Sequence, residues 1–445
     1  MTKNREKNRK GLFSQISLVV LVILMITVTG CESLPFDFEL PWDQNAIQLP
    51  GDLATQPAPE VTPTSQTEST EVLPLQPEKL IIWLPPDLDP HDDTEAGSLL
   101  IEKLNSYAYS NKIEIVVRVK SQTGSGSLID SLTATRAAVP EALPDLIVLS
   151  ANDLQLASQR DLIYENEQLT EMLGGSDWYS FARQLSQVDG KVLSIPFASD
   201  PLAMIYSSTN LLPPSGEWNQ IHKNYGIFGF AADDSLGRFL LLQYMSAGGD
   251  VMDGQGYTLL EEAPLIASLQ ALKDALNTRH INSLSLSYQN DSQVWQSFLD
   301  RNLDTAVVPV SLVLSHSYED SNQPHAALSE PPFTLATGSA WALASPDIAR
   351  QELALDLLEE LMQTEFLAKW TEALHRLPSK PSALGSWTEP DLKPALEKIA
   401  GATVIYPPNA VLNQLGPILR NATLLILRDG GDVVETARQA IESVK

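Results

Sequence analysis

The sequence predicts an α/β fold. Three continuous apolar runs have the length of strands, at residues 80–84, 113–119 and 146–149. Unbroken apolar runs are typical of strands that are buried on both faces, as in parallel sheets whose crossovers are helices. Helix-spaced apolar residues separate the runs, at 99–104 and 128–132. This alternation of strand and helix is the main reason for the α/β assignment.

The later predicted elements continue the same alternation. They are an amphipathic helix over 265–276, a strand over 305–310, a helix ending at about 363, a shorter helix ending near Trp370, and a last helix over about 432–444. Ser345 and Pro346 predict the start of the helix that ends at about 363, as its N-cap and its first helical residue. Thr364 is the predicted cap of the shorter helix.

The amino terminus has the pattern of a secretory signal peptide. Residues 1–10 are basic, and 16–28 form a charge-free apolar run of thirteen residues. That run is short for a membrane span, which needs about 20 residues. Val28-Thr29-Gly30-Cys31 resembles a bacterial lipobox, and Cys31 is the only cysteine in the chain. We predict a signal peptide over 1–30 and lipidation of Cys31; the alternative is an uncleaved anchor helix with an incidental cysteine.

Residues 31–77 have the composition of a tether. This stretch is rich in Pro, Ser, Thr, Gln and Glu and shows little helical or strand periodicity. Such a composition buries too little apolar surface to offset the entropy of ordering the chain. We expect the lipidated Cys31 and this segment to hold the folded part, which begins near residue 78, clear of the membrane.

The charge of the chain excludes one class of partner. The formal net charge is −27, with 56 acidic against 29 basic residues. A strongly negative protein repels the phosphate backbone, so we expect no nucleic-acid partner. A single cysteine also means that no intramolecular disulfide can form.

Several short motifs occur in one order along residues 78–445. They are PDLIVL at 144–149, DGKVLSIP at 189–196, AGGD at 247–250, GSAWALA at 338–344, FLAKW at 366–370 and RLP at 376–378. Each is weak alone, but in this order they resemble the extracellular solute-binding proteins of ABC importers, in the sugar-type branch that includes maltose-binding protein. No catalytic, phosphate-binding or metal-binding motif accompanies them, and we expect no enzyme activity, no metal and no cofactor.

The resemblance implies a two-lobed fold of the periplasmic-binding-protein type, in which each lobe has a mostly parallel sheet flanked by helices. Crossing strands would lie near 196–200, 304–310 and 341–346. One lobe would comprise 78–196 plus 307–340, and the other 197–306 plus 341–445. The implied function is capture of a small solute, a carbohydrate, by hinge closure. The solute would pass to an ABC permease at the outer face of the bacterial cell membrane, and we expect the protein to be a monomer.

Five residues are candidates for the solute site, because a neutral sugar needs directional hydrogen bonds and an aromatic face. They are Asp87 after the first strand, Asn152 at the carboxyl end of the third, Asp200 after the first crossing, Asp234, and Trp341 at a predicted crossing. Each has a structural alternative. Asp87 and Asp234 suit turns, Asn152 suits a helix N-cap, Asp200 suits an exposed hinge, and Trp341 suits the core. Arg376 is expected to form a surface ion pair rather than to contact the solute.

Two departures from the family pattern leave other functions open. The family's GPW motif is replaced by VSLV at 310–313, and 407–415 contains no aromatic residue. A site without these stacking rings would suit a smaller solute than an oligosaccharide, or would have lost binding. A secreted glycan hydrolase and a non-transporting sensor or interaction lipoprotein are the alternative functions.

Overall fold

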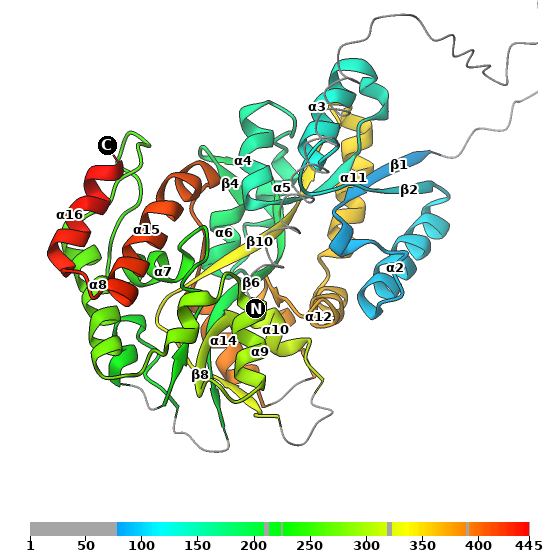
Figure 1. The fold of residues 1–445 in the computed structure, drawn as a ribbon. Helices are drawn as coiled ribbons and strands as arrows, with labels where there is room; N and C mark the ends of the chain where they lie inside the picture. The colour runs from blue at the N-terminus through cyan, green and yellow to red at the C-terminus, as the bar shows by residue number, and fades with distance from the viewer. Residues whose placement is uncertain (1–77, 209–212, 224–225, 318–322, 389–390, 445) are drawn as a thin grey trace, which may run out of the picture. The chain divides into compact units, whose positions relative to one another are not determined.

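The computed structural model describes residues 78–208, 213–223, 226–317, 323–388 and 391–444 (Figure 1). They belong to one compact unit, Pro74–Lys445. The predicted signal peptide, the lipidation site Cys31 and the tether lie outside the described residues.

The first half of the fold is built on a parallel sheet. β1 (Lys79–Leu84), β2 (Glu114–Val119) and β3 (Leu146–Ser150) pair in parallel in the order β2-β1-β3. β1 and β3 are almost completely buried, whereas β2, at the edge, is only partly covered. The three apolar runs therefore form strands, as predicted.

Short polar side chains begin most of the helices that surround this sheet. The elements are α2 (Glu95–Asn111), α3 (Leu128–Ala138), α4 (Ala151–Gln159), α5 (Glu167–Met172), α6 (Ser180–Ser186) and the hairpin β4 (Gln187–Val188) and β5 (Lys191–Val192), with 3-10 turns at Pro86–Leu88 and Pro140–Ala142. Thr94, Ser127 and Ser150 cap α2, α3 and α4 by accepting hydrogen bonds from backbone N–H groups of the first turn.

Two long antiparallel strands run through both halves of the sheet. β6 (Ile195–Ser207) pairs with β10 (Thr334–Leu343) over its first part and with β8 (Thr305–Pro309) over its second. The far end of β10 pairs with β3. The sheet is therefore parallel at β1–β3 and antiparallel where the halves join, and its path is β2-β1-β3-β10-β6-β8-β7.

The second half surrounds β7 (Phe228–Gly229), β8 and β9 (Ala326–Leu328). Its helices are α7 (Arg238–Ser246), α8 (Glu262–Asn277), α9 (Asp291–Leu299), α10 (Val310–Leu314), α15 (Asn409–Asp429) and α16 (Val433–Val444), with 3-10 turns at Trp218–Lys223 and Ser283–Ser287. The helices α7, α8, α15 and α16 pack together around a second apolar cluster (Figure 1). Among the described helices, α15 alone is long and apolar enough to cross a membrane, but it packs as a core helix of this cluster.

The expected division into lobes is wrong for two segments. Residues 307–340 were expected in the first lobe, but β8 and β9 pair with β6 in the second half. Residues 341–445 were expected in the second lobe, but α11 (Ile348–Leu361) packs on β1 and α12 (Thr364–Ala373) packs on α2. The reason is the course of β10, which carries the chain back into the first half.

The chain returns to the second half through a third connection that the sequence did not predict. β11 (Leu377–Pro378), α13 (Pro381–Gly385) and α14 (Lys393–Ala402) lead to β12 (Thr403–Ile405), which pairs in parallel with β10. Three residues are too few to show a strand period. The predicted crossing near 304–310 is instead β8, which stays within the second half.

The starts of two helices also differ from the prediction. Asp347, not Ser345, is the N-cap of α11, and its carboxylate accepts hydrogen bonds from two first-turn amides. Ser345 instead accepts a hydrogen bond from Asp347 N–H. The α12 helix begins at Thr364, so Gln363 occupies the cap position.

Candidate functional site

Two strands end opposite one another on the same side of β10. β3 is antiparallel to β10 and its last residue, Ser150, pairs with Ser339. β12 is parallel to β10 and its last residue, Ile405, pairs with Ala336. The carboxyl ends of β3 and β12 therefore point toward each other. In α/β proteins ligands bind at the carboxyl ends of strands, where the chain diverges.

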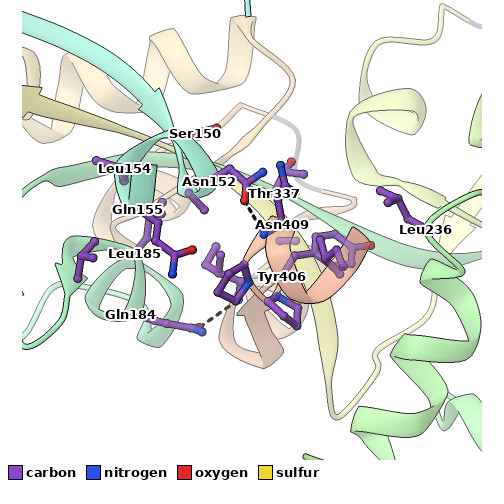
Figure 2. Close-up of a pocket in the computed structure, with 18 of the residues that line it drawn as sticks. Ser150, Asn152, Leu154, Gln155, Gln184, Leu185, Leu236, Thr337, Tyr406 and Asn409 are labelled. Atoms are coloured by element: carbon purple, nitrogen blue, oxygen red, sulfur yellow. Dashed lines mark hydrogen bonds between the residues drawn. The ribbon is translucent and has the colours of Figure 1, made fainter. Parts of the chain in front are cut away.

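A cavity of about 460 Å³ lies at this meeting point (Figure 2). Its volume is in the range usual for small-molecule sites. The first half contributes the start of α4 and residues 184–189, and the second half contributes the loop before α7 and residues 405–412. Residues 336–338 of β10 complete the lining. Both halves of the fold are therefore needed to form this cavity.

The cavity combines amide groups with aliphatic walls. The amides belong to Asn152, Gln155, Gln184, Gln187 and Asn409. The aliphatic residues are Leu154, Leu185, Val188, Leu236, Ile405, Pro407, Pro408 and Leu412. Amides donate and accept hydrogen bonds without carrying charge. This surface can bind a polar, uncharged molecule that also has an apolar face.

Asn152 is one of two predicted residues that line the cavity. It does not cap its own helix, because Ser150 caps α4. Its Oδ1 instead accepts a hydrogen bond from the backbone N–H of Asn409, the first residue of α15, at 2.8 Å. Asn152 therefore joins the two halves at the edge of the cavity.

Asp234 is the other predicted residue in the lining, and it belongs to a buried ion-pair network. The Asp234 carboxylate is 2.7 Å from Arg238 Nε, and Arg238 Nη1 is 2.8 Å from Asp291. Burial alone would lower the pKa of Arg238, but the adjacent carboxylates outweigh it and raise that pKa. The Arg238 charge is thus balanced by two carboxylates, which does not favour an anionic solute.

Tyr406 also lines the cavity, and it was not among the residues predicted from the sequence. It is the only aromatic residue among the described residues that line the cavity. Its hydroxyl is buried and has no hydrogen-bond partner within the described part of the chain. Burial raises the pKa of Tyr406 despite the opposing charge of Arg238, so the hydroxyl keeps its proton. Tyr406 directly precedes the stretch 407–415, in which no aromatic residue was found.

Asp200 lies outside the residues that line the cavity, and its carboxylate holds the start of α10. It accepts hydrogen bonds from Ser311 N–H at 3.0 Å and from Ser311 Oγ at 2.6 Å. Burial raises the pKa of Asp200, although the hydrogen bonds from Ser311 and the charge of Arg376 act in the opposite direction. Asp200, which was predicted to contact the solute, instead caps the start of α10.

Asp87 also lies outside the cavity, on the 3-10 turn after β1. Its carboxylate pairs with Arg376 at 2.7 Å and accepts a hydrogen bond from Gln122 at 2.9 Å. The expected ion pair of Arg376 is therefore present, and its partner is one of the predicted site residues.

Trp341 was expected in the cleft, and this prediction is wrong. Its side chain is fully buried, with the rings of Phe197 and Trp370 centred 5.8 and 6.2 Å away. Trp341 lies four residues beyond Thr337 on β10, where Trp370 of α12 covers the strand. Trp341 is therefore a core residue, which was the structural alternative for this position.

Residues 103–396 match the family described as bacterial extracellular solute-binding protein, over more than half of the chain. A search of curated proteins finds no match.

Three solved structures with a similar fold are sugar-binding proteins by their names. The cyclic α-maltosyl-1,6-maltose binding protein from Arthrobacter globiformis has a TM-score of 0.63 at 16% identity, and the similarity covers 83% of this chain and 98% of that chain. The sugar-binding protein MalE from Xanthomonas citri has a TM-score of 0.66 at 14% identity, covering 82% and 96%. A cyclo/maltodextrin-binding protein complexed with maltotetraose has a TM-score of 0.64 at 14% identity, covering 83% and 97%. At these identities the likeness shows a common two-lobed fold.

Proposed function

The chain belongs to the bacterial extracellular solute-binding protein family, and from this premise we propose that it captures a small carbohydrate in the cavity at the ends of β3 and β12. Closure of the two lobes would enclose the sugar, and the loaded protein would deliver it to an ABC permease. The observation that carries the proposal is a cavity lined by both lobes, because only such a site couples occupancy to closure.

The lining chemistry supports a neutral sugar. Sugar hydroxyls are recognised by directional hydrogen bonds, which the amides of Asn152, Gln155 and Gln184 can provide. The C–H faces of a sugar pack on apolar and aromatic surfaces, and the aliphatic walls and the ring of Tyr406 offer these. The paired charges of Asp234 and Arg238 disfavour sugar acids and sugar phosphates.

The number of aromatic side chains in the lining indicates the size of the sugar. Three comparison proteins carry maltose, maltodextrin or sugar binding in their names. In this chain Tyr406 alone offers an aromatic surface in the described lining, and Val310 to Val313 and the stretch 407–415 contribute none. We therefore assign a sugar of one or two rings rather than a long oligosaccharide.

The proposal also includes a lipid anchor at the amino terminus. The lipobox-like Val28-Thr29-Gly30-Cys31 would anchor the mature chain through acyl groups on Cys31. Each buried methylene contributes about 0.8 kcal/mol, so two or more chains anchor a protein stably. The acidic tether would then hold the lobes above the membrane.

Thermal unfolding in the presence of a panel of neutral mono- and disaccharides, sugar acids and malto-oligosaccharides tests the proposal. A ligand at 100 times its Kd adds roughly 2.7 kcal/mol of stability. We expect a rise in Tm with one or more small neutral sugars. A flat response over the whole panel would contradict the proposal.

Tyr406→Phe provides the matched variant for this experiment. Removing a buried, unpaired hydroxyl should leave the free energy of unfolding unchanged or raise it, because an unsatisfied group costs about 1–3 kcal/mol. The same change should weaken binding of the sugar by about tenfold if the hydroxyl bonds to it. Equal affinities in titration calorimetry would mean that the Tyr406 hydroxyl does not bond to the sugar.

A further inference from the structure

The segment from Ile405 to Asn409 is held in place by amide side chains of the opposite lobe. Gln184 Oε1 on α6 accepts a hydrogen bond from Ile405 N–H at 3.0 Å. Asn152 Oδ1 on α4 accepts one from Asn409 N–H at 2.8 Å (Figure 2). Between them, Tyr406 N–H donates to Ala336 O at 3.0 Å. The two remaining residues are prolines, which have no N–H. Every backbone donor of the segment is therefore used.

The bond to Asn409 fixes where α15 begins. The N-cap position of α15 is Pro408, whose side chain makes no capping hydrogen bond. The first-turn N–H groups of a helix need acceptors from outside the helix. Asn152 supplies one of them from the other lobe, so the starts of α4 and α15 are tied to each other across the cavity.

These two bonds also determine which way each amide faces. Both backbone partners are N–H donors, so the side-chain oxygens of Asn152 and Gln184 must face the segment. The Nδ2 of Asn152 and the Nε2 of Gln184 are turned away from it. Neither nitrogen has a hydrogen-bond partner that the described residues supply, and both residues line the cavity. The amides therefore present donors to a molecule in the cavity.

We propose that Asn152 and Gln184 are positioning residues that act as an amide clamp. Their oxygens hold the Ile405 to Asn409 segment, and with it Tyr406 and the start of α15, against the first lobe. Their nitrogens are thereby directed to acceptor oxygens of the solute. The hold on the segment depends only on contacts within this chain. The role of the amide nitrogens toward a solute rests on the proposed function.

Asn409→Pro removes one of the two backbone donors that the clamp holds, the partner of Asn152, and leaves Asn152 itself intact. Asn409 is the first residue of α15, a position that proline accepts. The preceding Pro408 has φ −52° and ψ 147°, which is the backbone region favoured before a proline. The helix should therefore survive, as circular dichroism can check.

The position of the lobes is measured with two spin labels on the full chain. The labels are placed by Tyr109→Cys in α2 and Val434→Cys in α16, both exposed, with Cys31→Ser to leave only these two thiols. Pulsed electron resonance then reports the distance between the lobes without any solute. We expect a shifted or broader distance distribution in Asn409→Pro and in Asn152→Leu.

Asn152→Asp separates the two roles of the amide. Aspartate keeps an acceptor for Asn409 N–H but replaces the donor with a second acceptor. The distance distribution should match that of the parent, while the affinity for the sugar found in the panel falls by about tenfold or more. Asn302→Asp, an exposed site outside the cavity, is the control that should change neither quantity.

The outcomes distinguish the two proposals. Distance distributions that stay unchanged in both Asn409→Pro and Asn152→Leu would overturn the clamp, whether or not a sugar is found. Changed distributions with no sugar in the panel would support the clamp and contradict the proposed function. Unchanged affinity in Asn152→Asp would overturn the assignment of the amide nitrogens to the solute.

Discussion

The carboxylate of Asp200 stabilises the first turn of α10 from a partly buried position on β6. Burial in low dielectric disfavours the charged form, and its effect on the pKa exceeds that of the hydrogen bonds from Ser311. The same balance applies to Asp291, whose pKa burial also raises despite the neighbouring Arg238. Both carboxylates therefore contribute to the dependence of stability on pH.

Asp200→Asn should flatten part of that dependence. The folded pKa of Asp200 lies above its unfolded value of about 3.9, so the folded state holds the proton more tightly. Its contribution to stability is therefore fully present below about pH 3.9 and is lost as the pH rises through the folded pKa. Asparagine cannot ionise, yet it can still accept the bond from Ser311 N–H.

The measurement is the free energy of unfolding in denaturant between pH 4 and pH 7. We expect the variant to lose less stability than the parent over this range. Parallel profiles would mean that Asp200 is ionised in the folded protein without penalty.

At the scale of elements, close packing between α15 and the loop before α7 shapes the cavity. A Cβ added to Gly416 would lie 2.7 Å from Leu236 Cα. Gly237 has φ +56°, and a Cβ there would lie 2.8 Å from Leu419 Cβ. Glycines thus let α15 approach the loop that carries Asp234 and leads into α7 at Arg238.

Gly416→Ala should separate these two elements. The new methyl group meets backbone atoms, which cannot rotate away as a side chain can. We expect a loss of about 1–3 kcal/mol in the free energy of unfolding, together with weaker binding of sugar.

Gly401→Ala in α14 is the control, because a Cβ at that position meets no atom within 4 Å. Alanine there should be neutral or stabilising by up to about 1 kcal/mol. Equal stabilities of the two variants would contradict the packing argument.

At the scale of the whole molecule, the chain passes between the lobes three times, through β6, β10 and β12. β6 and β10 are paired with each other, and β12 pairs with β10. The lobes are therefore connected by one small region of sheet. In a hinged protein such a region absorbs the change on closure while the lobes move as bodies.

Cys31→Ser tests how the whole protein is held at the cell surface. If Cys31 carries the lipid, the variant should lose lipid labelling with a radioactive or clickable fatty acid. Processing at Gly30–Cys31 should also stop, which raises the apparent mass by the unprocessed residues 1–30. A parent protein that retains residues 1–30 and takes no label would favour the uncleaved anchor.

The α/β class, the three parallel strands and the family were all predictable from the sequence. Each depends on residues close together in the chain, such as the apolar run of β1, or on motifs in a fixed order. The position of Asn152 beside the cavity was predictable for the same reason, because it lies two residues beyond a recognisable strand.

Only the tertiary structure decided what the other candidate residues contact. Trp341 is buried because α12 covers its part of β10. Asp200 is hydrogen-bonded to Ser311 because α10 begins beside it. Tyr406 enters the cavity because the three-residue strand β12 pairs with β10. These contacts join segments that are distant in the chain, so local periodicity carries no information about them. Packing between such segments determines which polar side chains are used by the fold and which remain for a solute.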